Sequence, residues 1–164
     1  MITPGQTYEG ENTVLYLQTA RYLMKTWQKI LSGSKVTKTV AYLKNYANRT
    51  ALMPKETFDT SPRGILRAVQ SATAGHVAKV FNNLQAKIQE GTSTGEAFNQ
   101  CGIELVKIGK LHAKVFMLQT ATNELEQAAR TCTPKLAYIF RDILELYSVD
   151  LAKNILGDLM QVYH

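Results

Sequence analysis

The sequence predicts an all-α protein, a helical bundle, from three features of the chain. Apolar residues recur at steps of three and four along most of its 164 residues, as they do on the buried faces of helices. Favoured cap residues stand before several of these stretches, and no segment shows the alternation of a strand. A hydrophobic fraction of 45% and a charged fraction of 20% are typical of a globular protein with its own core. No apolar run is long enough to predict a membrane span, so no membrane insertion is expected.

The first predicted helix begins after Asn12, a favoured N-cap residue, and runs to about Leu31. Its apolar stripe comprises Tyr16, Ala20, Leu23, Trp27 and Ile30, widened by Leu17, Met24 and Leu31. The segment Ser32-Gly33-Ser34 is expected to end it. Residues 36–60 are predicted to be a connector of modest structure, which around Val40–Tyr46 could be a short helix or an extended piece.

Two helices are predicted in the middle of the chain. Ser61-Pro62 opens the first, because serine is a favoured cap and proline a favoured first helical residue, and Gly91 ends it. Its expected buried face is Leu66, Val69, Thr73, Val77, Val80, Leu84 and Ile88. Ser93 and Glu96 form a capping box that starts the second, a long helix. Its expected seam is Phe98, Cys101, Leu105, Ile108, His112, Val115, Leu118, Thr122 and Leu125.

Thr133-Pro134 repeats the cap-and-proline start and predicts another helix. Its expected buried side is Leu136, Phe140, Ile143 and Tyr147. A break is predicted near Ser148, after which Leu151, Ile155, Leu159 and Val162 continue as a last helix.

The formal charge of +6 is compatible with nucleic acid, a membrane surface or an anionic metabolite, and does not choose among them. No compact basic patch is interleaved with aromatic residues, so nucleic acid is not expected as a partner. Cys101 and Cys132 stand in no metal-ligand or redox spacing, and we expect two reduced thiols and no metal site. No signal peptide and no C-terminal Ser-Lys-Leu address is recognisable.

The most suggestive segment for chemistry is Thr7-Tyr8-Glu9-Gly10-Glu11-Asn12-Thr13. Two acids flank a glycine just before a predicted helix start, where free amides and the helix dipole suit an electron-rich group. In the plainer interpretation, Glu11 only complements the dipole and Glu9 is a solvated loop residue. His112 lies on an apolar seam with no acid or cysteine at metal-ligand spacing, and is expected to be a hydrogen-bonded core residue.

The stretch from Thr7 to Leu23 closely resembles the active-site segment of the peroxisomal acyl-CoA oxidases. Tyr8-Glu9-Gly10 is shared with the related acyl-CoA dehydrogenases, whereas Glu11-Asn12-Thr13-Val14 and Leu17-Gln18-Thr19-Ala20-Arg21 are similar to the oxidase branch. Looser similarities follow at Ala97-Phe98-Asn99, Glu104-Leu105-Val106-Lys107, His112, Leu146-Tyr147-Ser148 and Gly157-Asp158. The resemblance covers essentially the whole chain.

This resemblance implies a flavin-dependent oxidation of fatty acyl-CoA to trans-enoyl-CoA, with oxygen as electron acceptor and hydrogen peroxide as product. It makes Glu9 the base that removes the α proton, and lets Gly10 admit the substrate. Glu11, Asn12 and Thr13 would lie near FAD. It also implies a homodimer and a peroxisomal location.

The family's chains are several times longer, so the resemblance implies a C-terminal piece of such a protein. Residues 1–35 would end the first C-terminal helical domain and hold the catalytic loop, 36–60 would connect, and 61–164 would form part of the second. Because the flavin-binding β domain would then be absent, the isolated chain is expected to bind FAD weakly or not at all and to be inactive. Two alternatives stay open: an acyl-CoA dehydrogenase, and a non-catalytic helical interaction or dimerisation module.

Overall fold

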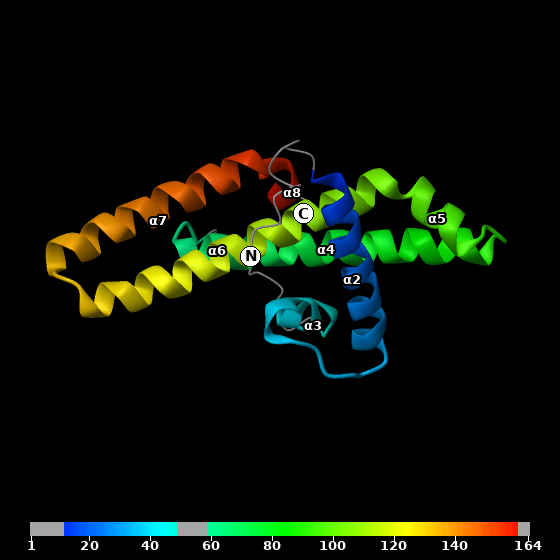
Figure 1. The fold of residues 1–164 in the computed structure, drawn as a ribbon, viewed down its shortest axis with the longest axis horizontal. Helices are drawn as coiled ribbons and strands as arrows, with labels where there is room; N and C mark the ends of the chain where they lie inside the picture. Colours follow the sequence, from blue (N-terminus) through cyan, green and yellow to red (C-terminus); the bar gives the residue numbers. More distant parts are fainter. Residues whose placement is uncertain (1–11, 49–58, 161–164) are drawn as a thin grey trace. The chain divides into compact units, whose positions relative to one another are not determined.

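The computed structural model describes residues 12–48 and 59–160 (Figure 1). These residues are mostly helical, and no strand occurs among them, so the all-α prediction is confirmed. The elements are α2 (Thr13–Leu31), the 3₁₀ helix η1 (Lys38–Val40), α3 (Ala41–Ala47), α4 (Pro62–Gln89), α5 (Thr94–Gln100), α6 (Gly102–Thr131), α7 (Pro134–Asn154) and α8 (Leu156–Met160). No helix in the described ranges has the length and apolar character needed to cross a membrane.

The described residues divide into two compact units, each with its own buried core. The first unit contains residues 12–36 and 76–110, and the second contains residues 37–48, 59–75 and 111–160. Helices α4 and α6 each contribute one part to either unit. The sequence-based division at residues 35 and 60 refers to the longer chains of the family and stays a prediction.

Helix α2 begins and ends where the sequence predicts, and its buried side follows the predicted stripe. The buried residues are Ala20, Leu23, Met24, Thr26, Trp27 and Ile30. The prediction for Leu31 is wrong, because its side chain is 61% exposed. Leu31 is the last helical residue before a turn in which Gly33 takes a positive φ of 77° and its amide donates to the carbonyl of Ile30. The helix ends there, and no further helical turn covers the side chain of Leu31.

Part of the predicted connector is helical. Of its two open possibilities, short helix or extended piece, the structure has η1 followed by α3, which bury Val40, Tyr42 and Leu43. These side chains belong to the core of the second unit.

Helix α4 confirms the start at Ser61-Pro62 and the end before Gly91. The Ser61 Oγ accepts a hydrogen bond from the amide of Gly64 at 3.0 Å, and Gly91 has a positive φ of 94°. The predicted face is buried from Leu66 to Leu84, while Ile88 is half-buried. Small residues widen this face, since Ala68, Ala72 and Ala74 are also buried.

The long helix predicted to start at Ser93 is instead two helices, α5 and α6, which meet at Cys101. The backbone of Cys101 has φ −92° and ψ 12°, outside the usual helical range, and Gly102 follows it. Glycine is a weak helix former, which favours an interruption here. The predicted seam holds across the break, because Cys101, Leu105, Ile108, Val115, Leu118 and Thr122 are buried. Phe98, His112 and Leu125 are half-buried.

The predicted buried side of α7 is wrong. Leu136 and Ile143 are 40% and 54% exposed, Phe140 and Tyr147 are half-buried, and the buried residues are Leu144, Ser148 and Leu151. The helix carries apolar residues on two neighbouring stripes, and period alone does not decide which one faces the core.

The predicted break near Ser148 is also wrong, because α7 continues to Asn154. The Ser148 hydroxyl donates to the carbonyl of Glu145 at 2.9 Å, so the buried serine is satisfied inside the helix. The chain breaks at Ile155 instead, so of the residues predicted for the last helix Leu151 belongs to α7 and Leu159 to α8. Leu151, Ile155 and Leu159 are all buried. Val162 lies outside the described residues.

Candidate functional site

Three of the five predicted site residues, Glu9, Gly10 and Glu11, lie outside the described residues. The other two stand at the start of α2, in the first unit. Asn12 is the N-cap residue as predicted, and its carbonyl accepts from the amide of Tyr16 at 3.0 Å. Its side chain makes no capping hydrogen bond, and the first turn of α2 contains no acid. The amide end of this helix is therefore not offset by a carboxylate of its own first turn.

The start of α2 packs closely against α6 at Gly109. A Cβ built on Gly109 would stand 2.5 Å from the carbonyl oxygen of Tyr16 and 3.0 Å from its Cα. Only glycine allows the two helix backbones to come this close. The close approach fixes where α2 begins relative to α6, and hence where Asn12 and Thr13 stand within the first unit.

Next to this contact, Lys110 extends over the face of Tyr16. Its Nζ lies 5.7 Å from the centre of the ring, a cation–π contact at a partly exposed position. Tyr16 therefore contacts α6 in two ways. Its backbone packs against Gly109, and its ring lies beneath the side chain of Lys110.

His112 is the predicted core histidine, and the structure places it in the second unit with Tyr42 of α3. The Tyr42 hydroxyl and His112 Nδ1 are 2.9 Å apart, and the two rings stack with centroids 6.0 Å apart. Burial lowers the pKa of His112 from its usual 6.5, because a charged imidazole is poorly solvated there. A half-buried, hydrogen-bonded neutral histidine is a packing residue, which agrees with the prediction.

The described part of the chain contains no group of three or more histidine, cysteine or acidic residues that could hold a metal ion. Cys101 and Cys132 are free thiols, and burial raises the pKa of Cys101.

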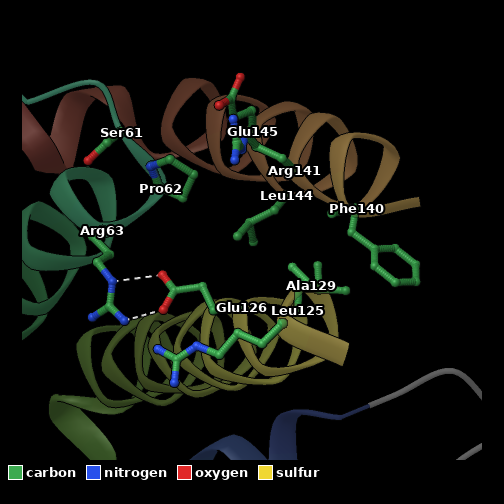
Figure 2. Close-up of a pocket in the computed structure, with 12 residues that line it drawn as sticks. Ser61, Pro62, Arg63, Leu125, Glu126, Ala129, Phe140, Arg141, Leu144 and Glu145 are labelled. Atoms are coloured by element: carbon green, nitrogen blue, oxygen red, sulfur yellow. Dashed lines mark hydrogen bonds and ion pairs between the residues drawn. The ribbon is translucent and has the colours of Figure 1, made fainter. Parts of the chain in front are cut away.

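A hollow of about 470 Å³ lies in the second unit, between the start of α4, the end of α6 and the first half of α7 (Figure 2). Arg63 of α4 and Glu126 of α6 form a two-bond ion pair on one side of it, with Nε donating to Oε1 at 2.7 Å. The Arg63 guanidinium lowers the pKa of Glu126, and Glu126 raises that of Arg63. On the α7 side, Phe140 and Leu144 give the hollow an apolar wall.

Sequence reasoning missed Gly109, the Tyr42 partner of His112 and the Arg63–Glu126 pair. A glycine inside an otherwise regular helical seam is a signal of close backbone approach, and Gly109 stands directly after Ile108 of that seam. The other two contacts join residues 70 and 63 positions apart, and no local pattern indicates such pairs.

Comparison with known proteins relates this chain to one family. The family model described as Acyl-CoA oxidase matches residues 61–164. The chain is 38% identical over 161 residues to acyl-coenzyme A oxidase 1 of Drosophila melanogaster, which covers 98% of this chain and 24% of that protein. It is 30% identical over 165 residues to peroxisomal acyl-coenzyme A oxidase 1 of Bos taurus, which covers 97% of this chain and 24% of that protein. The chain thus spans about a quarter of the length of these relatives.

A solved structure has the same fold. It is acyl-CoA oxidase-2 of Caenorhabditis elegans, described as bound with FAD, ascaroside-CoA and ATP. The TM-score is 0.80 at 22% sequence identity, over 96% of this chain and 22% of that chain. Because the family model covers more than half of its length, the chain belongs to the acyl-CoA oxidase family.

Proposed function

We propose that this chain is part of a flavin-dependent enzyme that oxidises fatty acyl-CoA thioesters to trans-enoyl-CoA, with FAD as cofactor and oxygen as electron acceptor, and releases hydrogen peroxide. We call that enzyme the natural protein. The observation that supports this most strongly is the 38% identity to the Drosophila melanogaster oxidase over 98% of the chain. The segment from Thr7 to Leu23, which carries the Tyr-Glu-Gly pattern of such enzymes, lies almost at its beginning.

In this proposal Glu9 removes the proton from the α carbon of the thioester. A carbon acid of this kind is too weak for a carboxylate in water, so the base must be desolvated and the developing enolate oxygen must meet hydrogen-bond donors. The backbone amide of Glu9 would supply one donor, and Gly10 would let the thioester approach the backbone. Bound FAD would supply the acceptor for the hydride of the β carbon, and hydrogen peroxide would come from its reoxidation by oxygen.

Asn12 and Thr13 are proposed to contact FAD, with Glu11 beside them. The start of α2 is chemically suited to this, because its first turn holds no acid and the Asn12 side chain is not used for capping. Polar side chains and helix amides at such a position can hydrogen-bond the electron-rich edges of a cofactor. The Caenorhabditis elegans relative, whose structure is described as bound with FAD, supports the choice of cofactor.

The first experiment is an assay of the natural protein with FAD and a fatty acyl-CoA, following enoyl-CoA, oxygen and peroxide together. We expect one peroxide for each enoyl product. Enoyl-CoA formed only when an artificial electron acceptor is present would instead support the acyl-CoA dehydrogenase alternative. Absence of enoyl product with FAD demonstrably bound would overturn the proposal.

A second candidate function is a non-catalytic helical interaction module, and the outer side of α7 favours it. Leu136, Ile139, Ile143 and Leu146 form an apolar stripe at steps of three and four, with exposures from 40% to 73%. We call these four residues the α7 stripe. Such a stripe on a helix is typical of a face that packs against another helix.

We propose that the protein forms a homodimer, as the family resemblance implies, and that the α7 stripe contributes to the contact. Sedimentation of the natural protein and of the double variant Ile143→Glu with Leu146→Glu tests this. We expect the variant to be monomeric with unchanged helix content. If the variant stays dimeric, the α7 stripe is not the contact. A protein that is monomeric without substitutions overturns the dimer proposal itself.

We propose a peroxisomal location because the Bos taurus relative carries that word in its name. Microscopy of the tagged natural protein beside a peroxisomal marker tests it. A diffuse distribution, or one confined to another organelle, would contradict the proposal.

A further inference from the structure

A second hollow, of about 510 Å³, lies within the first unit. Residues of α2, of the part of α4 after residue 76, and of α5 line it. Its apolar lining consists of Met24, Phe81, Leu84, Ile88 and Phe98. Its volume falls within the range of about 300–1,000 Å³ that is usual for small-molecule sites. We call it the α2–α5 groove.

The charged residues of the α2–α5 groove are both basic. Arg21 and Lys25 line it, stand one helical turn apart on α2 and are exposed, and no acidic residue contributes to the lining. Gln28, Gln85 and Asn99 add uncharged hydrogen-bonding groups. The groove therefore combines an apolar wall with a row of cationic and amide groups.

The surrounding unit strengthens this positive field. Its described residues include eight lysines and arginines and only three acids, Glu90, Glu96 and Glu104. Glu104 accepts hydrogen bonds from the amide of Asn83 at 3.2 and 3.3 Å, and Glu96 accepts from Gln100 at 3.4 Å. The groove's two cations thus lack an acidic neighbour in its lining, and an anion would be attracted to them.

Apolar surface beside paired cations is complementary to one kind of ligand. An alkyl chain would cover the apolar lining and gain free energy for each methylene removed from water. An anionic head group would lie against Arg21 and Lys25, where hydrogen bonds to charged donors are stronger than neutral ones. An uncharged lipid would not use the cations, and an inorganic anion would leave the half-buried apolar side chains Phe81, Ile88 and Phe98 in contact with water.

We propose that the α2–α5 groove binds a single-chain anionic amphiphile of the fatty carboxylate type. This site is separate from the residues proposed for catalysis. Its test uses binding heat, so it does not depend on oxidation being observed.

The test is isothermal titration of the natural protein with laurate below its micelle concentration. The informative variant is Arg21→Gln with Lys25→Gln, which removes two exposed charges and leaves the apolar lining intact. The matched control is Lys29→Gln with Lys35→Gln, which removes the same charge from exposed positions outside the lining. Circular dichroism checks that both variants keep their helix content.

We expect laurate to bind the natural protein, with the dissociation constant rising about tenfold or more in the Arg21/Lys25 variant, because two charge-assisted contacts are lost. The control should change it less than about twofold, since its charges act only at long range. Octanoate should bind more weakly than laurate by up to about fourfold per missing methylene.

Three results would overturn the proposal: no binding of laurate, equal weakening in the control variant, or equal affinity for octanoate and laurate. Dodecanol separates head group from chain. Binding of dodecanol as tight as that of laurate would show that the cations play no part, and would also overturn the proposal.

Discussion

Gly109 shows how the lack of one side chain positions a helix. A Cβ at this residue would stand 2.5 Å from the carbonyl oxygen of Tyr16. Because this is a backbone atom and not the end of a flexible side chain, rotating a side chain cannot remove the clash. The helices α2 and α6 would have to separate, and the residues at the start of α2 would move with them. If Asn12 and Thr13 contact FAD as proposed, Gly109 is a positioning residue for cofactor binding.

We predict that Gly109→Ala destabilises the protein by about 1–3 kcal/mol, the usual cost of overpacking a close contact. Urea unfolding measures this. Gly102→Ala is the matched control, because nothing lies within 4 Å of a Cβ built there. Adding alanine at the start of α6 should be neutral or stabilise by up to about 1 kcal/mol. A Gly109→Ala protein as stable as the natural one would contradict the close approach.

His112 makes stability depend on pH. Its pKa is lowered in the folded state by burial, so the folded protein favours the neutral ring. The contribution of neutral His112 to the free energy of unfolding is fully present above the unfolded pKa of about 6.5. It is lost as the pH falls below that value towards the folded pKa. We predict that unfolding free energy falls between pH 7.5 and pH 5.5, and falls less in His112→Gln. An equal fall in the variant would assign the dependence to other groups.

The hydrogen bond between Tyr42 and His112 can also be tested by changing Tyr42. Tyr42→Phe removes the hydroxyl that lies 2.9 Å from His112 Nδ1 and keeps the ring. We predict a loss of about 1 kcal/mol at pH 7.5, the typical net value of a hydrogen bond, measured by urea unfolding. Tyr22→Phe, at a 44% exposed tyrosine of α2, is the comparison and should have a smaller effect.

At the scale of elements, the ion pair between Arg63 and Glu126 joins the start of α4 to the end of α6. Both side chains are partly exposed, so water screens the pair and its contribution is modest. It nevertheless holds the two helix ends at one side of the second unit's hollow, opposite the apolar wall of α7.

We predict that Glu126→Gln lowers stability at pH 7 by less than Gly109→Ala does. The pKa of Glu126 is lowered in the folded state, so its contribution is present above the usual value of 4.5 and is lost as the pH falls through the folded pKa. The difference from the natural protein should therefore disappear in acid and shrink in high salt. Glu145→Gln, which lines the same hollow outside the ion pair, is the matched control and should change stability at pH 7 less than Glu126→Gln does.

The elements could be predicted from sequence where one stripe is apolar, and not where two are. Helix α2 has a single strong stripe from Ala20 to Ile30, and its bounds and buried face agree with prediction except at Leu31. Helix α7 has two, and the one at Leu144, Ser148 and Leu151 is buried although the predicted stripe contains more large apolar residues. Tertiary packing made that choice. The interruption at Cys101 could not be predicted from the apolar pattern either. The amide of Leu105 donates to the carbonyl of Cys101, and the apolar seam stays regular across the interruption.

At the scale of the whole molecule, the chain spans about a quarter of the length of its relatives, and the proposed activity belongs to the natural protein. The catalytic role of Glu9 is predicted from one local sequence pattern, its resemblance to the active-site segment of the family. Without that resemblance, Glu9 is only a carboxylate beside a glycine just before a helix. The contacts that position that helix, through Gly109 and Tyr16, could not be predicted in the same way. A glycine such as Gly109 signals that some backbone approaches closely, but its partner Tyr16 depends on where a distant helix packs, which no local motif encodes.

The proposed role of Glu9 is tested most directly by Glu9→Gln, which keeps shape and removes the base. Peroxide production from a fatty acyl-CoA is measured beside the visible spectrum of bound flavin, with Glu124→Gln as control at an exposed acid of α6. We predict that Glu9→Gln loses about 10²–10⁴-fold or more in turnover, the usual contribution of a positioned base. Its flavin spectrum should be unchanged, and the control should be fully active. Retained turnover in Glu9→Gln with flavin bound would contradict the account.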